Sequence, residues 1–188
     1  MVGYDFDKTI YDGDSSTDFF FYMIFHKPYL LLFAPYFLIV LLLYAVKIVS
    51  KKKVKELLFF FIPWFKKSIN KTVDKFWAKN ANKIYDWYSF QKKEDDVIIS
   101  ASLTFILEPI MNALAIKNWI STKYNIETGK IEGDNCYGEE KLKQYKRHYK
   151  SHELEAFYSD SLSDLPMMVF ARSAYLVEKK IPKKYEIK

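Results

Sequence analysis

Residues 1–14 read MVGYDFDKTIYDGD, and this stretch places two carboxylates directly after an apolar start. The pattern predicts a short buried strand over residues 1–6 that ends at Asp5 and Asp7, with a turn at residues 12–14. Residues two apart in an extended segment point the same way, so these two side chains would face one ligand together. A pair of acids alone is more often a turn or a helix cap, so the rest of the chain decides between a turn and a site.

The rest of the chain divides into a helical stretch and an alternation of strands and helices. Residues 15–87 are apolar and lysine-rich without strand alternation, which predicts helices, and the charged break QKKEDD follows at residues 91–96. From residue 97 onward short apolar runs alternate with helical patterns, which predicts an α/β core with a parallel sheet. We therefore expect a core formed by residues 1–14 and 91–188, with an all-helical cap inserted at residues 15–90.

Within the second part of the core, each element has a local signal. The hairpin is expected to turn at Thr128 and Gly129, and Ser163 is expected to cap the last helix. The predicted strands are 97–100, 117–122, 154–159 and 173–178, and the predicted helices are 103–116, 139–149 and 165–171.

The composition favours an anionic partner. The chain has 188 residues and a formal charge of +6, and nearly all of its positive charge is lysine. Its only arginines are Arg147 and Arg172, and base reading usually depends on arginine, so we expect no nucleic-acid partner. The single Cys136 excludes an internal disulfide, and the N-terminus shows no secretory signal, so we expect a cytoplasmic protein.

Polar side chains follow the predicted strands at the points where each strand ends. Ligands bind parallel α/β sheets at the carboxyl ends of the strands, so these side chains are expected to meet. Asp5, Asp7 and Asp160 would suit a hard cation such as Mg²⁺, and a lysine with a hydroxyl beside it would suit a phosphoryl group. The other candidate residues are Ser100 at the end of the strand 97–100, Lys141 early in the helix 139–149, and Asp164 at the start of the last helix.

Four segments in this order resemble the motifs of haloacid dehalogenase-superfamily phosphatases: DFDKT, VIISAS, NCYGEEK and YSDSLSDLPMM. The resemblance is strongest to the subgroup that contains phosphoserine phosphatase (subfamily IB), whose helical cap lies between the first two motifs. It implies a Rossmann-like core with a type C1 cap, and a Mg²⁺-dependent phosphomonoesterase.

The resemblance also implies a role for each residue of the first motif. Asp5 would be the nucleophile that carries the phosphoryl group as an aspartyl-phosphate. Asp7 would protonate the leaving alcohol and then activate water, and its backbone carbonyl would bind Mg²⁺. Thr9 would position the loop that carries Asp7.

The later motifs would complete the site. By the same resemblance, Ser100 would bind a phosphoryl oxygen and Lys141 would neutralise charge on Asp5 and on the phosphoryl group. Mg²⁺ would be held by Asp5, Asp7 and Asp160. Asp164 would support both the metal and the lysine.

Some positions depart from the family pattern. Ser159 stands where a glycine is common, and the second motif reads SAS rather than SGG. Asp14 stands at about the offset of the glutamate that recognises the amine of phosphoserine, so it is a candidate substrate contact. The cap has no arginine to clamp a substrate carboxylate, and lysine is a poor substitute at a bidentate site. Phosphoserine is therefore a weak candidate, and a soluble small-metabolite phosphatase remains the alternative within enzymes.

An uncharged run of 18 residues, Tyr29–Val46, lies in the middle of the expected cap. A single membrane crossing would separate Asp5 from Ser100, so a helical hairpin at the membrane surface fits better, with the lysines of residues 47–55 at the headgroups. The pattern resembles bacterial phosphatidylglycerophosphate phosphatases, which implies a lipid phosphate substrate and peripheral contact with an anionic membrane. Two alternatives are a soluble cap whose helices pack on one another and a membrane-binding module with a vestigial site.

Overall fold

The computed structural model describes residues 1–150 and 152–186, and it contains a six-stranded sheet in the order β3-β2-β1-β6-β7-β8. Five strands run parallel and β8 pairs antiparallel with β7 at the edge. This confirms the predicted α/β Rossmann-like core. The strands are β1 (Val2–Tyr4), β2 (Val97–Leu103), β3 (Asn118–Thr122), β6 (Ala156–Ser159), β7 (Ala174–Glu178) and β8 (Ile181–Tyr185).

The first strand lies in the middle of the sheet, between strands that come from far along the chain. Tyr4 is in register with Ile98 of β2 on one side and with Tyr158 of β6 on the other. The Asp5 N–H donates to the Tyr158 carbonyl at 2.9 Å, which extends this pairing to the first residue after the strand. Because β2 and β6 are both parallel neighbours of β1, the carboxyl ends of β1, β2 and β6 lie together.

Three helices of the core cover the sheet. Helix α7 occupies residues 139–149, as predicted, and α8 is one residue shorter than predicted. The prediction that Ser163 caps α8 was wrong: Ser161 caps the preceding 3-10 turn, and Asp164 stands at the N-cap of α8, although its side chain accepts no hydrogen bond from the backbone of that helix. The elements are α6 (Thr104–Ala113), α7 (Glu139–Tyr149), η4 (Leu162–Asp164) and α8 (Leu165–Phe170).

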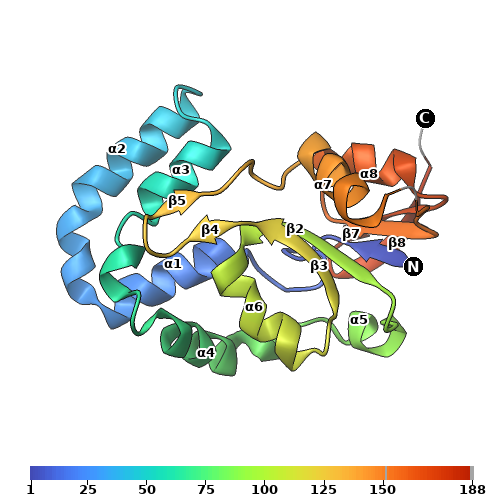
Figure 1. Ribbon diagram of the computed structural model, residues 1–188, viewed down its shortest axis with the longest axis horizontal. Helices are drawn as coiled ribbons and strands as arrows, with labels where there is room; N and C mark the ends of the chain where they lie inside the picture. Colours follow the sequence, from blue (N-terminus) through green and yellow to red (C-terminus); the bar gives the residue numbers. More distant parts are fainter. Residues whose placement is uncertain (151, 187–188) are drawn as a thin grey trace.

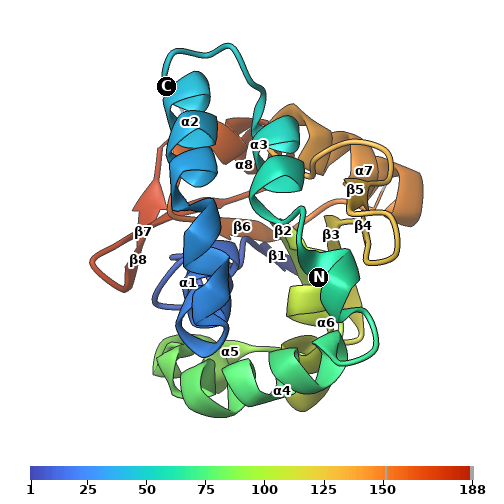
Figure 2. The same cartoon turned by 90° about the vertical axis from the view of Figure 1, so that its left-hand side faces the viewer.

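All regular structure between β1 and β2 in the described chain is helical. Helices α2 and α3 lie side by side, to the left of the sheet in Figure 1 and at the top of Figure 2. The segment Pro28–Ala45 is apolar and long enough to cross a membrane by composition alone, and only 17% of it is buried. The elements are α1 (Ser15–His26), η1 (Pro28–Phe33), α2 (Ala34–Ala45), α3 (Lys51–Leu58), η2 (Ile62–Phe65), α4 (Ile69–Asn80), η3 (Ala81–Lys83) and α5 (Asp86–Gln91).

One hydrophobic cluster joins the helical insertion to the sheet. Phe19 of α1 packs edge-on against Phe76 of α4 and against Phe105 of α6, with ring centroids 5.4 and 5.8 Å apart. Edge-to-face pairs at these distances are favourable. Because this cluster continues from the sheet into the insertion, α1 and α4 are anchored on the core.

A small hairpin ties α3 to the core. It consists of β4 (Tyr124–Asn125) and β5 (Lys130–Ile131), with Gly129 in the left-handed region at φ +70°, so the predicted turn is confirmed. The Tyr124 hydroxyl donates to the Phe59 carbonyl at 2.8 Å, and the Ile131 N–H donates to Glu56 Oε1 at 3.0 Å. The outer part of the insertion is thus held by this hairpin as well as by its own helices.

Candidate active site

Lys141 joins two carboxylates at the carboxyl edge of the sheet. Its ammonium donates to Asp5 Oδ1 and to Asp164 Oδ2, each at 2.6 Å, and the lysine is 2% exposed. Asp5 directly follows β1, whereas Asp164 lies between β6 and α8 and Lys141 lies in the first turn of α7. The structure therefore brings together three residues that come from opposite ends of the sequence.

The charges of this cluster depend on one another. Burial raises the pKa of Asp5, and the Lys141 ammonium opposes that shift. Burial by itself would lower the pKa of Lys141, but Asp5 and Asp164 outweigh it, so the pKa of Lys141 is raised. The lysine therefore stays charged over the physiological range and favours the ionised form of Asp5.

Asp7 is held by both of its carboxylate oxygens. Oδ1 accepts the Ser15 N–H at 2.7 Å, and Oδ2 accepts the Ser102 hydroxyl at 2.5 Å. Burial, followed by the nearby charge of Asp14, raises the pKa of Asp7 to about 6. A carboxyl that gains and loses its proton near neutral pH is suited to general acid–base work.

The second strand contributes a residue that the sequence reasoning missed. Ser100 is fully buried, and its Oγ accepts the Ser102 N–H at 3.0 Å; it is not among the residues that line the cavity described below. Ser102, two positions further along β2, is the hydroxyl that contacts Asp7. The sequence SAS carried the signal, because residues two apart in a strand face the same side.

The segment after β6 is fixed by hydroxyl groups. Ser159 Oγ donates to Asp164 Oδ2 at 2.8 Å, and the Asp160 N–H donates to the buried Thr9 hydroxyl at 2.9 Å. Thr9 thereby links the loop after β1 to the loop after β6. The serine at position 159, where the family often has glycine, adds a second donor to the Asp164 oxygen that receives Lys141.

The carboxylates of this edge suit a hard divalent cation. Asp164 Oδ1 is buried without a hydrogen-bond partner, and burial raises the pKa of Asp5 and Asp160, so a cation nearby would offset the cost of their charges. In residues 1–150 and 152–186 no three His, Cys, Asp or Glu side chains are close enough to hold a metal alone. Mg²⁺ would therefore rest on Asp5, Asp160, the Asp7 carbonyl and water, which is its usual preference.

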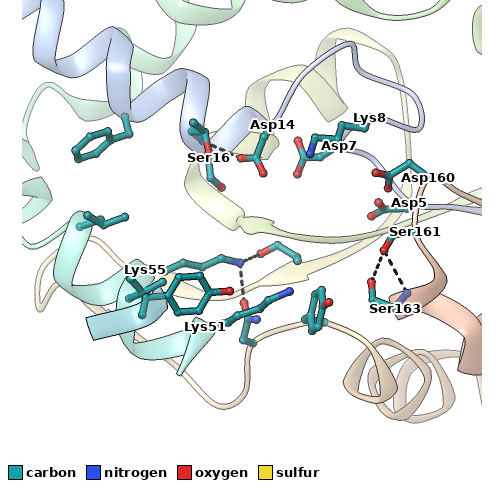
Figure 3. Close-up of a pocket in the computed structure, with 18 of the residues that line it drawn as sticks. Asp5, Asp7, Lys8, Asp14, Ser16, Lys51, Lys55, Asp160, Ser161 and Ser163 are labelled. Carbon is teal, nitrogen blue, oxygen red and sulfur yellow. Dashed lines mark hydrogen bonds between the residues drawn. The ribbon is translucent and has the colours of Figure 1, made fainter. Parts of the chain in front are cut away.

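These polar groups form one side of a cavity of about 500 Å³ (Figure 3). Asp14, which caps α1 by accepting the Thr17 N–H at 2.8 Å, also lines this cavity. Lys8 lines it from a left-handed backbone conformation, φ +57°, which costs a non-glycine residue energy and is typical of functional loops. The apolar side of the cavity comes from the helical insertion: Phe20, Phe21, Leu41, Tyr44, Val54, Leu58 and Phe59.

Helix α3 also sends two lysines into the cavity, Lys51 and Lys55. The sequence placed the lysines of residues 47–55 at lipid headgroups, and for Lys55, which is half-buried and bonded inside the protein, that placement was wrong. The Lys55 ammonium donates to the Ala101 carbonyl at 2.5 Å and to Asn135 Oδ1 at 2.7 Å (Figure 3). The cavity therefore has carboxylates with Lys141 on the sheet side, and lysines with apolar groups on the α3 side.

Comparison with solved structures shows that this arrangement is built on a known fold. A protein of unknown function from Bordetella pertussis Tohama I is similar at a TM-score of 0.77, with 16% identity over 93% of this chain and 87% of that one. A probable phosphoserine phosphatase from Vibrio cholerae is similar at a TM-score of 0.63, with 13% identity over 92% of this chain and 54% of that one. At these identities the similarity shows a shared fold.

Comparison of sequences identifies the family. A probable phosphatase of Mycobacterium tuberculosis is 38% identical over 81 residues, which span 39% of this chain and 28% of that relative. The family model described as haloacid dehalogenase-like hydrolase matches residues 2–169, well over half of the chain. This match includes every motif discussed above, and the chain belongs to the haloacid dehalogenase-like hydrolases.

Proposed function

We propose that this chain is a Mg²⁺-dependent phosphomonoesterase that forms an aspartyl-phosphate on Asp5. The observation that carries the proposal is the buried cluster of Asp5, Lys141 and Asp164 at one wall of a cavity large enough for a small substrate. Phosphoryl transfer needs positioning and charge stabilisation more than elaborate covalent chemistry. A nucleophilic carboxylate beside a permanently charged lysine supplies both.

The residues account for two chemical steps. In the first, a carboxylate oxygen of Asp5 forms a bond to phosphorus while the bond from phosphorus to the alcohol oxygen breaks, and Asp7 gives that oxygen its proton. In the second, Asp7 takes a proton from water as the water oxygen attacks phosphorus and releases Asp5. Lys141 stabilises the negative charge of the phosphoryl oxygens in both steps. A bound Mg²⁺ would supply further neutralisation of the same oxygens.

Phosphate release from an aryl phosphate tests this mechanism. With Mg²⁺ the wild-type protein is expected to release phosphate, and a chelator should abolish release. Asp5→Asn should lower kcat by about 10⁶-fold, the scale for loss of a nucleophile. Asp74→Asn changes an exposed aspartate of α4 and serves as the control. If Asp5→Asn retained the wild-type rate, Asp5 would not be the nucleophile.

The apolar side of the cavity supports a phosphorylated lipid or another amphiphile as substrate, phosphatidylglycerophosphate included. Phe20 and Phe21 of α1 and Leu41 and Tyr44 of α2 lie there, beyond the polar groups of the sheet edge. A substrate with its phosphate at Asp5 would place the rest of the molecule against these side chains. Apolar walls with a few placed polar groups are typical of sites for such ligands.

The outer face of α2 supports contact with a membrane. Leu38, Ile39 and Leu42 are 56–59% exposed, and Leu32 in the preceding turn is 82% exposed. Soluble proteins rarely expose contiguous apolar side chains on this scale without a partner. Net positive charge and flanking lysines favour an anionic lipid surface as that partner. A cytoplasmic protein with peripheral membrane contact fits these features.

Co-sedimentation with liposomes tests the membrane contact. The wild-type protein should pellet with vesicles that contain phosphatidylglycerol and should pellet less with neutral phosphatidylcholine vesicles. Leu38→Asp with Leu42→Asp should keep the protein in the supernatant, because both charges would enter the hydrocarbon boundary. Phe90→Asp changes an 89% exposed aromatic residue of α5 and serves as the control. Wild-type protein that stays in the supernatant with both vesicles would exclude the membrane contact.

A soluble phosphatase for small metabolites is the second candidate. It is supported by structural neighbours such as the phosphoserine phosphohydrolase-like protein from Francisella tularensis, similar at a TM-score of 0.55 and 18% identity over 96% of this chain and 88% of that one. A panel that contains phosphatidylglycerophosphate and phosphoserine separates the candidates. Higher kcat/KM for phosphoserine would favour the soluble reading.

A further inference from the structure

One face of α3 lines the cavity through a mixed set of residues. Lys51, Val54, Lys55 and Leu58 all lie on the cavity wall. Their spacing of three and four residues is that of a single helix face. The two lysines are one helical turn apart, so their ammonium groups can reach the same ligand. Figure 3 shows both of them entering from α3, on a different side of the cavity from Asp5 and Asp160.

The Lys55 ammonium is bound by neutral oxygens only. Its hydrogen bonds go to the Ala101 carbonyl and to Asn135 Oδ1, and within the described chain no carboxylate lies in ion-pair contact with it. An ammonium has three donors, and these bonds account for two. Burial lowers the pKa of Lys55 to about 8, which shows how poorly its charge is compensated. An anion in the cavity would supply the missing compensation.

Lys51 adds a second positive group to the same wall. Its ammonium lies 3.3 Å from the centre of the Tyr137 ring, which also lines the cavity. This cation–π contact holds the lysine toward the cavity. Two ammonium groups near a single carboxylate or phosphodiester would form a bipartite anion site.

We propose that Lys55 and Lys51 form a second anion subsite, which binds a carboxylate or phosphodiester carried by the leaving-group part of the substrate. The inference rests on the proposed phosphatase function, because it places the phosphoryl group at Asp5 and the second anion at α3. It narrows the substrate class to phosphomonoesters whose alcohol carries another negative charge.

A purely structural role for Lys55 would be to tether α3 to the core, and the chain offers a matched control for that role. Lys52 is also on α3 and donates to the carbonyl of Gly133, in the same segment that contains Asn135. Lys52 does not line the cavity. If tethering is the only role, removal of either lysine should have the same effect.

Calorimetric binding to the Asp5→Asn protein in Mg²⁺ buffer tests the subsite without turnover. The probes are three phosphomonoesters of a three-carbon alcohol that ends in a carboxylate, a methyl phosphodiester or a carboxamide. At least one of the two anionic probes should bind at least about tenfold more tightly than the carboxamide probe. A tenfold ratio corresponds to the free energy of about one charge-assisted hydrogen bond. Adding Lys55→Met should remove that ratio, Lys55→Arg should keep most of it, and Lys52→Met should leave it unchanged.

Two results would overturn the subsite. One is equal affinity of Asp5→Asn for all three probes, and the other is an equal loss of the ratio in Lys55→Met and Lys52→Met. Whichever anionic probe binds more tightly, the carboxylate or the phosphodiester, indicates which of the two groups the natural substrate carries. Failure of the proposed function would be seen separately, as absence of aryl phosphate release by the protein with Asp5 intact. The binding ratio would still be measurable in that case.

Discussion

Replacement of Lys141 by methionine would test the buried ion cluster directly. The lysine side chain is 2% exposed, and its two hydrogen bonds of 2.6 Å join Asp5 and Asp164, whose side chains are 11% and 2% exposed. Methionine has a similar length and no charge, so it would fill the space without the cation. Both carboxylates would then be left without an ion-pair partner in the part of the chain that the structure describes.

The cost follows from that burial. Removing one partner of a buried ion pair destabilises a protein by about 3–5 kcal/mol, because it leaves charge that is neither solvated nor paired. That is a large part of a typical total stability of about 5–15 kcal/mol. Urea unfolding at pH 7 with EDTA, which removes any bound metal, should therefore show a much lower midpoint for Lys141→Met. Lys183→Met, which removes an exposed ion pair with Glu178, is the control and should unfold near the wild-type midpoint.

The stability of the same variant should also depend on pH, and the direction of that dependence follows from the pKa of Asp5. Burial raises the folded-state pKa of Asp5, and in Lys141→Met the opposing lysine is absent. A group whose folded pKa lies above its unfolded value takes up a proton on folding, so folding becomes more favourable as the pH falls. Because the pKa of Asp5 is already about 8 in the wild-type protein, the difference between variant and wild type should shrink as the pH falls from 9 to 8 and should stay nearly constant between pH 7 and pH 5. Equal midpoints at pH 7, or a difference that grows as the pH falls, would refute this reasoning.

Three further predictions use other contacts. Ser102→Ala should lower kcat by about tenfold with little change in KM, because the general acid loses a charge-assisted donor. Gly3→Ala should lower stability in urea by about 1–3 kcal/mol, since its Cβ would lie 2.8 Å from a ring carbon of Phe157. The preference for anionic probes should weaken above pH 8, where burial makes Lys55 lose its proton; titration of binding from pH 6 to 9.5 would show this. The ionisable groups acting on that ammonium are Asp7, Asp14, Lys51 and Cys136.

Much of the fold could be predicted because its signals are local. The apolar run at 97–100 and the amphipathic pattern at 139–149 each depend on a short window, and the structure has a strand and a helix there. The edge strand β8 was missed, since Ile181–Tyr185 contains two lysines and a proline and lacks strand alternation. Its pairing depends on β7 beside it, which a local pattern does not contain.

Part of the site could also be predicted from local motifs, and part depends on how distant segments pack. Asp5, Lys141 and Asp164 could be named from motif order, and the structure places them in contact. Lys51 and Lys55 were predicted at lipid headgroups because the lysines of residues 47–55 lie between two apolar runs. The spacing of Val54 and Leu58 was the available signal, since these residues mark the inward face of α3 and the two lysines share it. The side of a short helix that faces inward depends on the segment it packs against. For α3 that segment contains Asn135, which lies 80 residues from Lys55 in the sequence.

The apolar run of the insertion both lines the cavity and forms an exposed surface, and the sequence alone does not distinguish these two roles. Leu41 and Tyr44 of α2 line the cavity, although Leu41 is also 49% exposed, and Leu38 and Leu42 on the same helix are exposed without lining the cavity. If the hydrophobicity of α2 served packing alone, its outward side would carry polar residues, as amphipathic helices of soluble proteins do. Burial of only 17% of Pro28–Ala45 therefore argues against a cap whose apolar helices simply pack on one another. A helix apolar on both sides is what the proposed function requires, with one face for the proposed membrane contact and the other for the cavity that leads to Asp5.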